Sequence, residues 1–126
     1  MGAETTKQVA EKLVALCKAG QDAEALLLYR DDAVSVEAAL APGMDSRETH
    51  GLEGLRGKHA WWEENFEVHG AEVEGPFPHG EDRFGVIFSV DSTHKASGQR
   101  SAMKELAVYH VDDAGKIFRE EFFYAG

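Results

Sequence analysis

The 126-residue sequence predicts an α+β fold, in which helices pack on one face of an antiparallel sheet. Two stretches indicate the helices, because apolar residues recur at steps of three and four before residue 30 and again over residues 52–66. A third observation indicates the sheet, since apolar and polar residues alternate along much of residues 68–124. The length is typical of one folding unit, so we expect a single domain over residues 1–126.

The N-terminal part predicts two helices and one strand. Helical spacing of apolar residues continues to Gly20, and glycine is a common helix terminator. A second, short helix is expected to start at Asp22 and to include Tyr29. The alternation that follows predicts a strand with Ser35 and Glu37 on the same face.

A third helix is predicted after a loop over residues 41–49, which should border any opening of the fold. This helix has one stripe of mostly large apolar side chains, at Leu52, Leu55, His59, Trp62 and Phe66. His59 is therefore expected to point in the same direction as the leucines. Lys58 and the nearby glutamates are expected to form the solvated face of the helix, and Gly70 is expected to end it.

The second half of the chain predicts strands. Residues 68–74 and 83–91 alternate as strands do, and the glycines and prolines of residues 75–80 are expected to interrupt the sheet between them. Residues 101–124 contain two further alternating runs. These runs flank residues 112–115, whose acidic start and closing glycine suit a type I turn, so a hairpin is expected.

One face of this terminal hairpin has an unusual composition. It is expected to combine apolar and aromatic side chains with two glutamates and no basic residue, at Met103, Glu105, Ala107, Tyr109, Phe118, Glu120, Phe122 and Tyr124. A carboxylate on an apolar surface needs a partner, a raised pKa or a chemical role. A three-residue loop would pair Ala107 with Glu121, and a four-residue loop would pair Ala107 with Glu120. We favour the second register, because it gathers the basic residues on the opposite face.

Charge and composition exclude several classes of partner. The formal net charge is -10, with 23 acidic residues against 13 lysines and arginines, and the basic residues do not cluster. Nucleic acid and anionic membranes are therefore not expected as partners. The first residues lack the apolar stretch of a signal peptide, and no run approaches the ~20 apolar residues of a membrane span. Cys17 is the one cysteine, so we expect a soluble protein of the reducing cytoplasm.

Neither a metal ion nor an organic cofactor is expected. No two of the six histidines have the i, i+4 spacing of a helical metal site. The sequence also contains no phosphate-binding glycine loop, no nucleophile elbow and no dinucleotide fingerprint.

The order of several short motifs resembles a known family. The run at residues 28–34 follows two helices, His50-Gly51 opens a third, and residues 115–117 precede a last strand that ends in Phe123-Tyr124. This order resembles the SnoaL-like and ketosteroid-isomerase-like family of the nuclear-transport-factor-2-like superfamily, over almost the whole chain. The resemblance implies a cystatin-like cone, in which a strongly curved antiparallel sheet wraps a long helix and encloses an apolar cavity. It also implies a homodimer formed through the sheet.

The resemblance extends to one catalytic position and fails at two others. Aligned on the Tyr-x-Asp-Asp-Ala motif, Glu37 corresponds to the carboxylate base of ketosteroid isomerases. The same alignment places Leu13 and Ala107 where those enzymes have the two donors of their oxyanion hole. Such donors commonly supply several kcal/mol of transition-state stabilisation, so ketosteroid isomerisation itself is not expected.

The residues themselves suggest a different proton-transfer site. Glu37, Glu105 and Glu120 are expected to converge from three strands and to meet His59, which gives the candidate catalytic set. Simpler interpretations are a solvated Glu37 at a strand end and a His59 that only binds a backbone carbonyl. The candidate ligand-binding residues are Leu13, Trp62, Phe66, Phe88, Ala107, Tyr109, Phe122 and Tyr124.

Two functions follow as hypotheses. The first is a cofactor-free acid/base enzyme of the isomerase, cyclase or dehydratase type, acting on a small apolar substrate. The second is a non-catalytic module of the same fold, which binds a ligand or forms a dimer.

Overall fold

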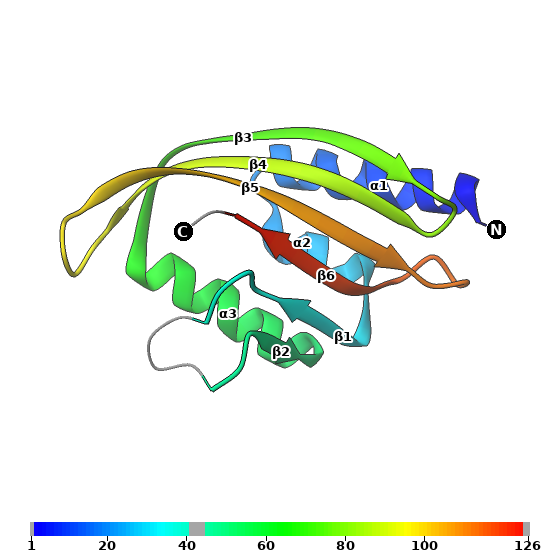
Figure 1. Cartoon of the computed structure of the whole chain (residues 1–126), viewed down its shortest axis with the longest axis horizontal. Helices are drawn as coiled ribbons and strands as arrows, with labels where there is room; N and C mark the ends of the chain where they lie inside the picture. The colour runs from blue at the N-terminus through cyan, green and yellow to red at the C-terminus, as the bar shows by residue number, and fades with distance from the viewer. Residues whose placement is uncertain (1, 41–44, 125–126) are drawn as a thin grey trace.

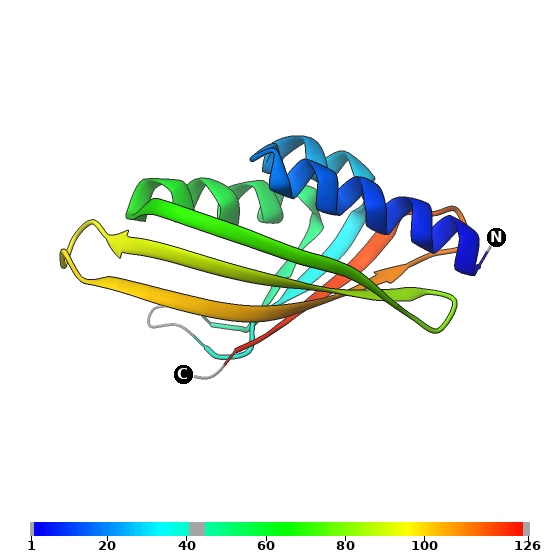
Figure 2. The same ribbon diagram turned by 90° about the horizontal axis from the view of Figure 1, so that it is seen from above.

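The computed structural model describes residues 2–40 and 45–124. These residues form three α-helices, one short 3-10 helix and one six-stranded sheet. The sheet is curved, and Figure 2 shows the helices together on one of its faces. The predicted α+β fold, with N-terminal helices on a curved and largely antiparallel sheet, is therefore confirmed.

The N-terminal helices begin largely where the sequence predicts. Helix α1 spans Ala3–Lys18, and Gly20 follows it with a φ of 72°, the left-handed conformation that ends helices. Helix α2, Asp22–Ala25, leads into the 3-10 helix η1, Leu26–Leu28. The expected inclusion of Tyr29 in the second helix is wrong, because Tyr29 begins strand β1, Tyr29–Val36, and is buried there.

The third helix is shorter than predicted. Helix α3 spans Gly51–Asn65, so Gly70 does not end it, and Phe66 already belongs to the next strand. The short strand β2, Glu48–His50, begins in the last two residues of the predicted loop and pairs with the end of β1. The loop prediction for residues 41–44 lies outside the described residues.

The remaining strands form the predicted antiparallel meander. They are β3, Phe66–His79, β4, Arg83–His94, β5, Arg100–Val111, and β6, Ile117–Phe123. Strand β3 continues through Gly75 and Pro76 to His79, contrary to the predicted interruption, and Gly80 lies in the turn that follows. The pairing with β4 shifts register between Glu74 and Phe77, and this irregularity accommodates Gly75 and Pro76.

One pair of neighbouring strands in the sheet is parallel and joins segments that are far apart in the sequence. The strand order is β2-β1-β6-β5-β4-β3, and β1 runs parallel to β6 while every other neighbouring pair is antiparallel. Figure 1 shows β1 beside β6, in front of the helices and at the side opposite β3. This pairing brings the first strand of the chain next to the last one, so residues of β1 and β6 can share one site.

The terminal hairpin has neither of the two predicted registers. Ala107 pairs with Phe122, because the register shifts between His110 and Val111. Phe118 is the extra residue of this bulge and lies near His110, not on the face of Ala107. The predicted face otherwise persists, since Tyr109 is directly opposite Glu120 and Ala107 is directly opposite Phe122.

The turn of this hairpin matches the prediction in its chemistry. The Asp112 side chain accepts hydrogen bonds from the backbone N–H groups of Ala114 and Lys116. Gly115 has a φ of 82°, as expected for the residue that closes such a turn.

Burial is uneven along the inner face of the sheet. Phe84 and Val86 of β4 and Ala107 of β5 have no exposed surface and belong to the same core cluster as the buried residues of α1. Further along the same strands, Phe88 and Glu105 are only partly buried. The inner face of the sheet is therefore fully buried around Phe84 and less buried further along the same strands.

Candidate functional site

Glu120 is the buried centre of a polar cluster between β1, β6 and α3. Its residue is 4% exposed, and its carboxylate accepts hydrogen bonds from the hydroxyl groups of Tyr29 and Ser35. The Ser35 Oγ to Glu120 Oε2 distance is 2.7 Å. These two donors compensate for the water that the carboxylate loses on burial. The parallel pairing of β1 with β6 places Ser35 directly opposite Glu120.

Lys58 connects this buried centre to Glu37. Its ammonium group donates a hydrogen bond to Ser35 Oγ at 2.7 Å and forms an ion pair with Glu37. The hydroxyl of Tyr124 donates to the other oxygen of Glu37 at 3.3 Å. The side chains of Lys58 and Glu37 are 25% and 20% exposed, so this end of the cluster is in contact with solvent.

Glu105 lies on the same inner face and has a perturbed pKa. The pKa of the Glu105 carboxyl is raised to about 7, chiefly by burial and also by the negative charges of Glu37 and Glu120, while the positive charge of Lys58 opposes the shift. At neutral pH the group therefore exists in both protonation states. A carboxyl with this property can accept a proton and return it without a large energetic penalty.

Two buried tyrosines remain protonated beside the cluster. Burial raises the pKa of Tyr29 and of Tyr109 well above the usual value, and the charge of Glu120 raises both further. The Tyr29 hydroxyl therefore keeps its proton at neutral pH and remains a hydrogen-bond donor to Glu120. Tyr109 stacks on Phe84 with ring centroids 4.9 Å apart and belongs to the core.

The structure brings three of the four candidate catalytic residues together. Glu37, Glu105 and Glu120 interact electrostatically around Lys58. His59 is only partly buried, and within the described residues no hydrogen bond or ion pair joins it to a carboxylate. The helix turns by about 100° per residue, so Lys58 and His59 leave α3 in different directions, and it is Lys58 that meets the carboxylates.

The candidate ligand-binding residues fall into three groups. Leu13, Ala107 and Tyr109 are packed in the core with at most 3% exposure. Trp62 stacks on Phe66 at 4.1 Å, and Phe66 also lies near His94 at the far end of α3. The partly buried residues beside the cluster are Phe88, Phe122 and Tyr124.

Three residues of the cluster were missed by sequence reasoning. The prediction that Lys58 lies on a solvated face is wrong, although its spacing contained the signal: Lys58 follows the fully buried Leu55 by three residues. Ser35 was placed on the face of Glu37 but given no role. Tyr29 was assigned to a helix, and only the pairing of β1 with β6 brings its hydroxyl to Glu120.

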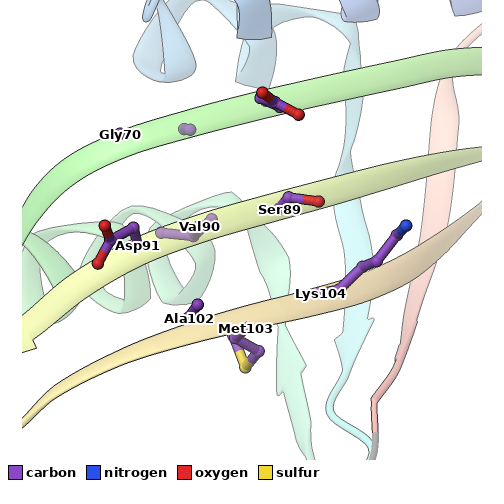
Figure 3. Close-up of a pocket in the computed structure, with 9 residues that line it drawn as sticks. Gly70, Ser89, Val90, Asp91, Ala102, Met103 and Lys104 are labelled. Carbon is purple, nitrogen blue, oxygen red and sulfur yellow. The ribbon is translucent and has the colours of Figure 1, made fainter.

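Two hollows lined by described residues lie away from this cluster. The larger has a volume of about 510 Å³ and crosses the middle of β3, β4 and β5. Figure 3 shows that its residues form rows across the three strands, among them Ser89 with Lys104 and Asp91 with Ala102. The smaller hollow, of about 320 Å³, lies beside Thr6 and the turn at residues 111–113. Neither includes a candidate site residue.

Comparison with known proteins decides the family. The SnoaL-like domain family matches residues 4–124. The chain belongs to the SnoaL-like family. A proposed SnoaL-like polyketide cyclase from Mesorhizobium loti is 43% identical, with a TM-score of 0.85 over 94% of this chain and 97% of that one. The predicted resemblance is thereby confirmed. Among curated proteins, no match was found.

More distant solved structures share the fold of this SnoaL-like chain. A proposed isomerase from Bacillus subtilis is 13% identical, with a TM-score of 0.74 over 97% of this chain and 87% of that one. A protein from Mycobacterium tuberculosis, in complex with estradiol-17beta-hemisuccinate, is 17% identical, with a TM-score of 0.69 over 99% and 95%. These relationships confirm the nuclear-transport-factor-2-like fold.

Two further properties concern the described part of the SnoaL-like chain only. None of its helices is long and apolar enough to cross a membrane. No group of three or more His, Cys, Asp or Glu side chains in residues 2–40 and 45–124 is arranged to hold a metal ion.

Proposed function

We propose that this SnoaL-like domain catalyses proton transfer on a small, largely apolar molecule, with Glu105 as the acid/base group. The observation that carries the proposal is the partly buried Glu105 carboxyl, whose pKa of about 7 suits both removal and return of a proton. Isomerisation, cyclisation and dehydration all need such a group. The isomerase and cyclase descriptions of similar proteins agree with this class of reaction.

The other residues of the cluster take distinct roles. Phe88, Phe122 and Tyr124 provide the apolar surface against which the molecule packs next to Glu105. Glu120 is a positioning residue, because its oxygens are occupied by Tyr29 and Ser35. The steroid derivative bound by the mycobacterial protein supports a ligand with a rigid and largely apolar skeleton.

The first step in testing this proposal is to find a compound that the protein binds. Native mass spectrometry of the purified protein, followed by a panel of small ketones, enones and hydroxy ketones, would identify compounds that bind and react. Glu105→Gln keeps the shape of the side chain and removes its acid/base function, so turnover should fall by about 100-fold or more. Glu74→Gln on the exposed part of β3 is a matched control and should retain full activity. Unchanged turnover in Glu105→Gln would reject the proposal.

A second candidate function is ligand binding without chemistry. It is favoured by Leu13 and Ala107, which are buried apolar residues where the resemblance to ketosteroid isomerases expects the oxyanion donors. In that case the wild-type protein binds members of the panel and converts none of them. Binding that depends on Phe122 together with an absence of turnover at every pH between 5 and 9 would favour this function.

We also propose a homodimer formed through the outer face of the sheet. Leu106 and Phe123 are paired neighbours on that face and are 40% and 51% exposed, and Phe77 nearby is 49% exposed. Exposed apolar groups of this kind are typical of protein interfaces. Light scattering should give the mass of a dimer for the wild-type protein and of a monomer for Leu106→Glu. Leu27→Glu, at an exposed leucine on the helical side, should leave the dimer intact.

A further inference from the structure

We propose that Lys58 forms an oxyanion subsite, which binds the carbonyl oxygen of a neutral ketone or enone and stabilises the enolate formed from it. This inference rests on the proposed function, since it names the class of substrate on which Glu105 would act. It also identifies a catalytic group that the sequence pattern assigned to the solvated side of α3.

The hydrogen bonds of Lys58 leave one donor available. A lysine ammonium group has three N–H bonds. One of them points to Ser35 Oγ at 2.7 Å and a second to Glu37. Within residues 2–40 and 45–124, no third acceptor lies at hydrogen-bonding distance. The ammonium lies 4.9 Å from the centre of the Phe122 ring, on the apolar surface proposed for the ligand.

The surroundings hold Lys58 as a fixed positive charge. Ser35 gives its single hydroxyl proton to Glu120, so it can only accept from Lys58. Glu37 adds a direct negative charge, and Tyr124 holds the other oxygen of Glu37. An ammonium group that is positioned before the reaction starts stabilises a developing oxyanion at little reorganisation cost. The proposal gives Lys58 the role of a hydrogen-bond donor, not that of a nucleophile toward carbonyl groups.

The balance of charge selects a neutral substrate. Glu37, Glu105 and Glu120 already face the single positive charge of Lys58, so a ligand that arrives as an anion is repelled. Proton transfer from a neutral ketone adds no charge to the site. The C–H bond next to the carbonyl breaks, its electron pair forms the carbon–carbon double bond, and the carbonyl π pair moves to oxygen. The proton bonds to Glu105, so the negative charge moves from Glu105 to the oxygen beside Lys58.

Return of the proton completes the cycle. Glu105 delivers it to another carbon of the enolate, the carbonyl forms again, and the product leaves as a neutral molecule. The donor on α3 would thus take the place of the donors that are absent at Leu13 and Ala107.

A phenol tests the subsite without turnover, because a phenolate resembles an enolate in charge and shape. The probe is 2-naphthol, whose neutral and ionised forms absorb at different wavelengths. At pH 6 the wild-type protein should bind it with a measurable fraction ionised. Lys58→Met should lower the ratio of ionised to neutral bound probe by about ten- to 100-fold, the effect of losing a charge-assisted hydrogen bond. Lys58→Arg retains the charge and should recover much of this ratio.

Two further variants separate folding effects from the subsite. Lys104→Met makes the same substitution on an exposed lysine and should leave the ratio unchanged. Lys58→Met combined with Glu37→Gln removes the ion pair as a unit, and it should fold normally while showing the same loss of ionisation. Thermal unfolding of each variant reports its folded state.

The outcomes distinguish this inference from the proposed function. Wild-type protein that binds no 2-naphthol, or binds only the neutral form, overturns the subsite, as does an unchanged ratio in Lys58→Met. Reductive trapping of an aldehyde on Lys58 by borohydride would also overturn it, since it would show a nucleophilic amine. If instead Glu105→Gln retains full turnover while ionisation still depends on Lys58, the acid/base role of Glu105 fails and the oxyanion subsite stands.

Discussion

Substitution of Tyr29 by phenylalanine tests whether the buried carboxylate of Glu120 organises the cluster. The substitution keeps the ring, which is buried in the core at 7% exposure, and removes only the hydroxyl that donates to Glu120. Glu120 is 4% exposed, so water cannot replace the lost donor, and Ser35 remains its one hydrogen-bonding partner among the described residues. The perturbation is therefore one lost hydrogen bond to a carboxylate that stays buried.

The expected cost follows from this arrangement. A hydrogen bond to a charged group typically contributes about 1.5–3 kcal/mol, so Tyr29→Phe should lower the free energy of unfolding by about 2 kcal/mol at pH 7. For a chain of this length that change corresponds to a decrease in Tm of about 7 °C. Urea denaturation followed by circular dichroism and by tryptophan fluorescence measures the free energy, and calorimetry measures Tm.

Tyr124→Phe is the matched control. Its hydroxyl donates to the partly exposed Glu37 at 3.3 Å, where water can take its place, so the same substitution should cost less than about 0.5 kcal/mol. A loss in Tyr29→Phe no larger than that in the control would refute the reasoning. It would mean that Glu120 does not depend on Tyr29 for its burial.

Three further outcomes are expected for stability. The pKa of Glu105 is raised from 4.5 to about 7 in the folded protein, so ionisation of Glu105 destabilises the fold as pH rises from 4.5 to 7. Between pH 4 and pH 8 the free energy of unfolding of Glu105→Gln, measured by urea titration, should therefore increase by about 2–3 kcal/mol relative to that of the wild-type protein. A difference between the two proteins that does not change with pH would contradict the pKa assigned to Glu105. Leu13→Ala should cost about 2–5 kcal/mol in the same assay, because this leucine is 1% exposed beneath the sheet. Gly115→Ala should cost about 1–2 kcal/mol, since the glycine has a φ of 82° and an added Cβ would lie 2.9 Å from Thr5 Cγ2; an equal stability would show that the turn can relax.

Most of the fold could be predicted from the sequence because its patterns are local. Apolar spacing revealed α1 and α3, and alternation revealed β4, β5 and β6. The errors arose where the structure depends on contacts distant in sequence. Strand β3 tolerates Gly75 and Pro76 because the pairing with β4 continues on both sides of the irregularity, and such long-range pairing is not encoded in the local pattern.

The candidate site could be predicted only in part, for the same reason. The inward position of Glu105 and Glu120 follows from alternation, which is local, and a bulge at Phe118 changed the register without changing their face. The partners of Glu120 depend on the parallel pairing of β1 with β6, which joins residues about 90 positions apart. Lys58 was overlooked because a charged residue was assumed to be solvated, although a lysine can lay its apolar stem along a buried stripe.

Solvent exposure of the side chains increases from Glu120 and Ser35 to Lys58 and Glu37, and this difference separates structural from chemical roles in the polar cluster. Glu120 and Ser35 lie at the dry end, where each hydrogen-bonding atom has a partner and a substitution would mainly affect stability. Lys58 and Glu105 lie toward the accessible end, where one donor and one carboxyl still have capacity to interact. The buried Ser35 hydroxyl fixes the direction of the Lys58 ammonium group, so Ser35→Ala should reduce oxyanion binding and stability together. Glu105→Gln should instead remove proton transfer and leave the contact between Lys58 and Ser35 intact. A cluster without this division of roles would lose both properties at every position.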